Sequence, residues 1–271
     1  MGRTQHLSQL FEKAYQDFHS RPHRDLDPIK LVHQYTEPRD QEVAAFLTAL
    51  LAYGTVATIV SSVEKVLVPL GKSPHDYIKT AGNLNSLWKG FTHRFTRGED
   101  IEILAYWIQA ALRSHGSLEA FFVHESKSDS MKDLLSSFVQ RFTDQDLPGH
   151  LRKVAIQRKR NLKYLISDPN RGSACKRLNL FLRWVVRPQD GIDLGLWKKV
   201  SPAQLILPLD THLLKTLHQL KWTRSHQASW KVAELATQKL KHYDAADPIR
   251  FDFALCHLSM SGYNLKSIAQ D

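Results

Sequence analysis

The apolar residues of this chain recur with the period of an α-helix along almost its whole length. In the N-terminal stretch they stand three or four positions apart, as on one face of a helix, at Leu7, Leu10, Phe11, Ala14, Tyr15 and Phe18. No run shows the convincing alternation of a half-buried strand. The chain is therefore predicted to be all-α, with about a dozen helices joined by short turns.

Helix start and stop signals divide this pattern into segments. A capping residue followed by a proline suited to the first turn occurs at Asp27-Pro28, Ser73-Pro74, Ser201-Pro202 and Asp247-Pro248. Residues 40–54, with Asp40 as the cap and Gly54 as the stop, are apolar nearly all round and are expected in the core. Further helices are expected at 56–70, 99–115, 117–124, 129–144, 150–166, 173–187, 201–207, 211–220, 225–243 and 248–260.

Two polar stretches, 125–133 and 144–149, could divide the molecule into two lobes. We expect a single compact domain, residues 1–271, with one lobe at about 40–145 and the other formed by 1–39 and 146–271. A cleft between two helical lobes is a natural place for a binding site.

The composition excludes several classes of protein. Two cysteines, Cys175 and Cys256, are too few for a disulfide scaffold, an iron–sulfur cluster or a four-cysteine zinc site. There is no apolar run of membrane-spanning length, no secretory signal, and no phosphate-loop, zinc-protease or serine-hydrolase motif. The histidines form no convincing metal pair, although a single carboxylate could still hold magnesium. We expect a cytoplasmic monomer without cofactor or metal.

The formal net charge of +10 is concentrated in one segment. Residues 151–187 hold eleven lysines and arginines and one acid, so 11 − 1 gives +10 and the rest of the chain sums to zero. Such a segment is typical of a polyanion-binding surface, although a solvated helix face would also explain it. The residues expected to contact DNA are Arg158, Lys159, Arg160, Lys163, Arg171, Gly172, Ser173 and Arg177.

Two ionisable residues begin helices within the stretch 171–220. Asp210 is at an N-cap, where an aspartate commonly does no more than accept a backbone N–H, worth about 1 kcal/mol. Lys176 lies in the first turn of a helix expected from about Ser173, where the positive helix end, Arg171 and Arg177 all favour the neutral amine. A neutral lysine can act as a Schiff-base nucleophile, whereas a solvated or phosphate-contacting lysine is the simpler interpretation.

The order of these motifs resembles the helix-hairpin-helix DNA glycosylase superfamily, over about residues 40–70 and 150–262. The matching elements are Lys176 at a helix start and the segment Leu207-Pro208-Leu209-Asp210-Thr211-His212. The separation of 34 residues (210 − 176), and 168–173 in place of a Gly-Val-Gly hairpin, are more similar to the archaeal GO (8-oxoguanine) glycosylases. Residues 40–55 and 247–255 also resemble a bacterial family known mainly as uncharacterised.

The resemblance implies a two-lobed glycosylase-like fold that flips a damaged base, 8-oxoguanine above all, out of double-stranded DNA. Lys176 would attack the sugar C1′ and Asp210 would assist, giving glycosylase and AP lyase activity in the nucleoid, with both side chains facing one cleft. The side chains expected around the base are Trp184, Trp222, Phe181 and Pro208.

Three alternatives remain open at this point. In a monofunctional glycosylase, Asp210 would activate water and Lys176 would contact phosphate. A non-catalytic DNA- or RNA-binding protein could retain the fold, and a protein-interaction scaffold is the third possibility. His93 and Arg94, in the polar turn at 91–95, could also reach DNA but are not part of the predicted site.

Overall fold

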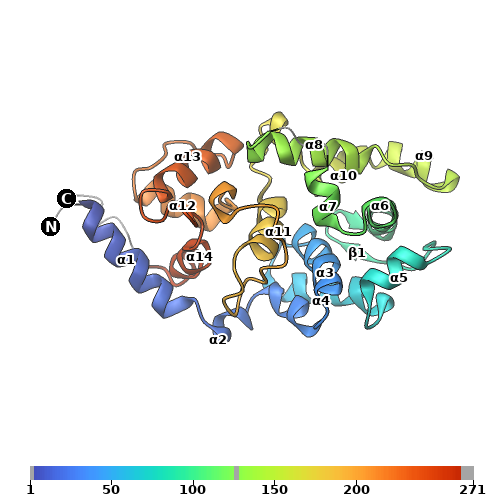
Figure 1. The fold of residues 1–271 in the computed structure, drawn as a ribbon, viewed down its shortest axis with the longest axis horizontal. Coiled ribbons are helices and arrows are strands. Elements are labelled where there is room, and N and C mark those ends of the chain that lie inside the picture. The colour runs from blue at the N-terminus through green and yellow to red at the C-terminus, as the bar shows by residue number, and fades with distance from the viewer. Residues whose placement is uncertain (1–2, 125–127, 264–271) are drawn as a thin grey trace. The chain divides into compact units, whose positions relative to one another are not determined.

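A computed structural model describes residues 3–124 and 128–263 of the chain (Figure 1). Within these ranges the protein is mostly helical, which confirms the all-α prediction, and two short strands are the exception. The chain divides into two compact units, of which unit 1 comprises residues 1–25 and 171–271 and unit 2 comprises residues 26–170.

Unit 1 is built from both ends of the chain. Its helices are α1 (Arg3–Phe18), α2 (Arg21–Arg24), α11 (Lys176–Val186), η4 (Pro202–Gln204), α12 (Thr211–Gln219), α13 (Trp230–Leu240) and α14 (Asp252–Met260), and η3 (Pro169–Arg171) crosses its boundary. The blue α1 lies beside the red α14 in Figure 1, and α14 also packs on α12. Phe11 of α1, which is fully buried, contacts the rings of Tyr243 and Phe251, so the N-terminal helix closes this core.

Unit 2 is continuous in sequence. It contains η1 (Pro28–Gln34), α3 (Pro38–Leu50), α4 (Val56–Leu67), η2 (Val68–Leu70), α5 (Pro74–Thr80), β1 (Thr92–His93), β2 (Thr96–Arg97), α6 (Gly98–His115), α7 (Leu118–Val123), α8 (Met131–Thr143), α9 (Gly149–Gln157) and α10 (Lys159–Leu165). The helix α3 is buried over most of its length, as its apolar pattern predicts. Phe46 of α3 meets Phe138 and Phe142 of α8 edge to face, which fixes the packing of these two helices.

Several predicted helix starts are confirmed and others were wrong. The Asp27 side chain accepts the Ile29 N–H and Ser201 accepts the Ala203 N–H, as predicted for caps. Asp40 is not a cap, because α3 begins at Pro38; it lies buried in the first turn and accepts hydrogen bonds from Ser73 Oγ and the His75 N–H. Pro248 begins a turn, and the last helix starts at Asp252.

The antiparallel hairpin β1–β2 was not predicted. Its register pairs Thr92 with Arg97 and His93 with Thr96, and strands of two residues are too short to show an alternating pattern. His93 and Thr96 are buried, and both are held by Tyr53, whose hydroxyl lies 3.1 Å from the His93 carbonyl and 2.6 Å from Thr96 Oγ1. The hairpin is therefore fixed by a contact forty residues away in sequence.

The unit boundaries fall at 25/26 and 170/171, whereas the sequence-based lobes place residues 26–39 and 146–170 with the chain ends. The basic segment 151–187 is consequently shared between the two units. Of the two polar stretches expected to divide the lobes, 125–133 lies partly outside the described residues. The predicted glycosylase-like arrangement with a cleft stays a prediction.

Candidate functional site

Lys176 is the first residue of α11 in unit 1, and it is half-buried. The helix starts three residues later than predicted because Gly172 and Cys175 have positive φ angles, +82° and +47°, which turn the chain before it enters the helix. Ser173 forms an isolated antiparallel bridge with Ser229 at the start of α13. This loop therefore fixes the backbone that carries the lysine against a second helix of the same unit.

Asp210 is the N-cap of α12 in the same unit, and it is also half-buried. Its Oδ1 accepts the Leu213 N–H at 2.9 Å, which confirms the predicted cap. Its Oδ2 lies 3.9 Å from the Cys256 thiol of α14. The preceding apolar segment is buried and tied to α13 by the Leu207 N–H, which donates to Thr237 Oγ1 at 3.0 Å. The direction of the carboxylate is thus set by three helices.

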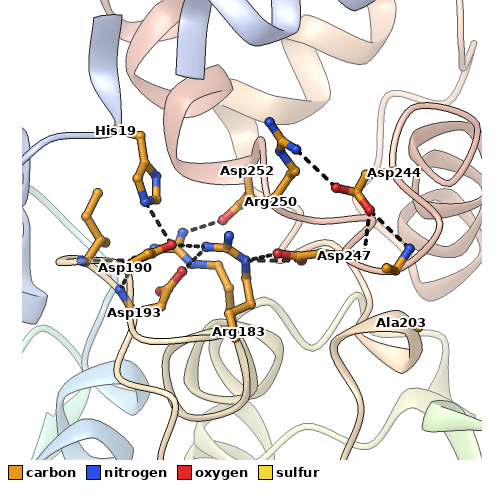
Figure 2. A network of polar contacts seen from close by, with 12 residues as sticks. His19, Arg183, Asp190, Asp193, Ala203, Asp244, Asp247, Arg250 and Asp252 are labelled. Atoms are coloured by element: carbon orange, nitrogen blue, oxygen red, sulfur yellow. Dashed lines mark hydrogen bonds and ion pairs between the residues drawn. The ribbon is translucent and has the colours of Figure 1, made fainter. Parts of the chain in front are cut away.

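Unit 1 also contains a buried network of ion pairs, which joins α11 to α14 (Figure 2). Arg183 lies on α11, and Arg187, four residues later, is the C-cap residue of that helix. The carboxylates that they contact are Asp190, Asp193, Asp247 and Asp252. Arg183 reaches Asp193 at 3.1 Å and Asp252 at 2.5 Å. Two guanidinium groups therefore meet four carboxylates, one of which, Asp190, also contacts His19.

The carboxylates of this network differ in proton affinity. Burial raises the pKa of Asp252 to about 6, because desolvation outweighs the attraction of Arg183, and the nearby charge of Asp210 adds to the rise. Burial also raises the pKa of Asp247. The pKa of Asp190 is held below its usual range: burial opposes this, but His19, 2.9 Å away, and Arg187 both favour the anion.

Only part of the basic segment is available to a polyanion. Its exposed cations are Arg152, Lys153, Lys159, Arg160, Lys163 and Arg171. Arg183 and Arg187 belong to the buried network, and Arg177, a predicted DNA contact, is only 9 % exposed. Arg158, also predicted to contact DNA, instead forms a two-fold ion pair with Asp100, which is fully buried in unit 2. Counting charges in the sequence therefore overstated the basic surface.

The predicted base-pocket residues are mostly core residues. Phe181 and Trp184 of α11 are 2 % and 1 % exposed, and Pro208 is buried. A ring with so little exposed area has no face on which a base can stack in this conformation. Trp222 is half-buried, with its ring near those of Phe11 and Tyr243. The aromatic spacing on α11 thus reflects helix packing rather than a ligand pocket.

The remaining predicted residues lie at the surface around the unit boundary. Gly172 is exposed, and its carbonyl accepts the Trp230 N–H at 3.1 Å. Ser173 is half-buried, and its Oγ accepts the Cys175 N–H.

Among the described residues, no group of three or more His, Cys, Asp and Glu side chains could hold a metal ion. In the same part of the chain, every helix is too short or too polar to cross a membrane.

Sequence reasoning missed the acids of the network. Asp193 is fully buried and Asp252 is 3 % exposed, yet in sequence they look like loop and helix-start residues. One signal was available: Asp252 lies between two phenylalanines in Phe251-Asp252-Phe253, where an unpaired acid would be costly. A second signal was the pair of arginines, Arg183 and Arg187, which stand four positions apart near the end of a predicted apolar helix.

A family model described as "Protein of unknown function (DUF2400)" matches residues 27–261, which is most of the chain. No curated protein and no solved structure matches the chain.

Proposed function

The chain belongs to the DUF2400 family, whose description assigns no activity, and from its own residues we propose that it is a DNA glycosylase with AP lyase activity. Lys176 is the nucleophile and Asp210 is the assisting carboxylate. One observation supports the proposal most: a lysine and an aspartate stand, both half-buried, at the starts of two helices of the same unit. The order of this pair in the chain resembles that in the helix-hairpin-helix glycosylases.

Lys176 attacks C1′ of a damaged nucleotide, and the N-glycosidic bond breaks with its electron pair leaving on the base. The Asp210 carboxylate stabilises the positive charge that develops on the sugar, and it accepts the proton that the lysine nitrogen loses once the neutral amine has bonded to C1′. The sugar then opens to a Schiff base with Lys176. Loss of a C2′ proton expels the 3′ phosphate and cuts the strand, and water releases the lysine. We propose 8-oxoguanine as the base, on the resemblance alone.

The setting of each residue supports its role. Lys176 is half-buried at the first residue of α11, where the positive φ of Cys175 turns the chain into the helix. The cap hydrogen bond from Leu213 leaves the Asp210 Oδ2 for other contacts. Arg171, an exposed cation of the same unit, is suited to hold a phosphate of double-stranded DNA.

Borohydride trapping tests the proposal. Duplexes carrying 8-oxoguanine, uracil, an alkylated base or an abasic site are incubated with protein and borohydride, and covalent adducts are resolved on a denaturing gel. We expect an adduct with the wild type that is lost in Lys176→Gln. Lys215→Gln removes an exposed lysine from α12 in the same unit and should trap normally.

The outcomes separate the alternatives. Release of a base without any adduct identifies a monofunctional enzyme in which Asp210 activates water. Binding of the duplexes without release of any base leaves a non-catalytic DNA-binding protein. Adduct formation that persists in Lys176→Gln assigns the nucleophile to another lysine.

A further inference from the structure

An exposed aromatic cluster lies on unit 2, the unit that does not contain Lys176 and Asp210. It consists of Tyr53, Phe95 and Tyr164, which come from the loop after α3, the tip of the β-hairpin and α10. Phe95 stacks on Tyr53 with ring centroids 5.0 Å apart and meets Tyr164 edge to face at 4.5 Å. Phe95 is 37 % exposed and Tyr164 is 48 % exposed. Two packed aromatic residues are therefore partly exposed to solvent.

The backbone beneath this cluster is fixed. His93 is buried, with Nδ1 2.8 Å from Ser62 Oγ and Nε2 3.0 Å from the Tyr53 carbonyl. The Phe95 carbonyl accepts hydrogen bonds from Arg158 and Asn161, at 3.0 and 2.8 Å. These contacts hold the hairpin tip against α10 before any ligand arrives, which lowers the entropic cost of binding.

Two exposed arginines come from the same segments as the rings. Arg94 is exposed, and its side chain lies over Gly54: a Cβ at that glycine would be 3.8 Å from Arg94 Cδ and 3.9 Å from Nη1. Arg160 is exposed and lies one helical turn before Tyr164 on α10, so the two side chains share a face. Glu99 is the exposed acid nearby, whereas Asp100 is neutralised by Arg158.

Arg94 is held at φ +54°, in the left-handed region that glycine prefers. Such a conformation is unfavourable for an arginine, and residues held in this way occur often at binding sites. The position therefore retains a guanidinium where the backbone alone would favour glycine.

We propose that this surface, formed by Arg94, Phe95, Arg160 and Tyr164, binds an unpaired nucleotide of single-stranded nucleic acid. The base stacks on the exposed rings, and the guanidinium groups contact the flanking phosphates. The bases of a duplex are stacked on one another, so a single strand is the form whose bases offer a free face. The inference does not rest on the catalytic proposal, because every residue involved belongs to unit 2.

The test is fluorescence anisotropy of 5′-fluorescein-labelled oligo(dT) with the full-length protein, against the matched duplex and at several salt concentrations. We expect the single strand to bind with an affinity that falls as salt rises, and the variants at this surface to weaken single-strand binding more than duplex binding. Phe95→Leu should weaken binding by roughly fivefold to a hundredfold, with little change in salt dependence.

Arg94→Gly is the sharper variant, because glycine fits the backbone at this position and misfolding cannot explain a loss of binding. It should weaken binding and lower the salt dependence by roughly one phosphate contact. Lys72→Ala, which removes an exposed lysine from another loop of unit 2, should bind as the wild type.

Two results would overturn the inference: no binding of the single strand, or an unchanged affinity for the single strand in both Phe95→Leu and Arg94→Gly. Adduct formation at Lys176 is a separate readout, so failure here and failure of the glycosylase proposal are distinguishable. A surface that binds no nucleic acid would then be assigned to a protein partner.

Discussion

At the scale of single residues, Asp252 shows how one buried acid links the fold to proton binding. Its carboxylate is held by Arg183 at 2.5 Å, yet the cost of removing the charge from water is larger than this attraction. The pKa therefore rises to about 6, and the folded protein holds the proton more tightly than the unfolded chain does.

This shift predicts the sign of a pH effect. Between about pH 4 and pH 6 the folded state binds more protons at Asp252 than the unfolded state, so its contribution to stability is full below this window and lost as the pH rises through it. From 3.8 to about 6 the loss is about 3 kcal/mol. The advantage of the wild type over Asp252→Asn in urea unfolding should fall by this amount between pH 4 and pH 7.

Two features make the comparison specific. Asp247 has a pKa raised in the same direction but is present in both proteins, so its effect cancels in the difference. Asp146→Asn changes a fully exposed carboxylate and should leave the profile of the wild type unchanged. A difference between wild type and Asp252→Asn that is constant with pH would mean that Asp252 does not titrate in this range.

At the scale of elements, helix positions could be predicted because the 3.6-residue period is local information. The break between α9 and α10 could not, since it occurs at Arg158, whose side chain is bound to Asp100 fifty-eight residues away. The β-hairpin likewise depends on Tyr53. Asp210 and Lys176 were placed correctly at helix starts, although the start of α11 moved because Cys175 adopts a left-handed conformation.

The same limit applies to the site residues. Which arginines of the basic segment are buried depends on acids elsewhere in the fold, such as Asp252, sixty-nine residues from Arg183. An aromatic residue at helical spacing, such as Trp184, has the same pattern whether it packs in a core or lines a pocket. The order of motifs along the chain therefore sufficed to select Lys176 and Asp210 as candidates. Which side chains surround them could be learned only from the structure.

The cap of α12 provides a prediction that separates stability from activity. Asp210→Ala removes the acceptor of the Leu213 N–H and should lower the free energy of unfolding by about 1 kcal/mol. Asp210→Asn keeps an acceptor oxygen and should stay close to the wild type in stability. If the carboxylate assists catalysis, both variants should lose borohydride adduct by roughly a hundredfold or more.

Ser117→Ala is the matched control, because it removes the cap of α7 in unit 2, where Ser117 Oγ accepts the Ala120 N–H at 3.0 Å. It should lose comparable stability and keep normal adduct formation. Normal trapping by Asp210→Asn would leave Asp210 as a helix cap alone.

At the scale of the whole molecule, the charges and the proposed sites are divided between two units. Lys176 and Asp210 belong to unit 1, which needs both ends of the chain, whereas the aromatic surface and most exposed cations of the basic segment belong to unit 2. Unit 2 is one continuous segment with its own buried core around Phe46, Ile103 and Phe138. A continuous segment with its own core is the usual condition for independent folding.

We therefore predict that residues 26–170, produced alone, fold and bind single-stranded oligo(dT). The fragment should give a helical circular dichroism spectrum and a cooperative thermal transition, because the contacts that hold its core and its hairpin lie within it. The same fragment carrying Phe46→Ala should melt at a lower temperature, since removing a buried phenylalanine costs about 3–5 kcal/mol. The fragment of residues 26–170 should form no borohydride adduct, because it lacks Lys176. A fragment that folds but does not bind the single strand would place the binding residues in unit 1, and one that shows no cooperative transition would make the core of unit 2 dependent on the chain ends.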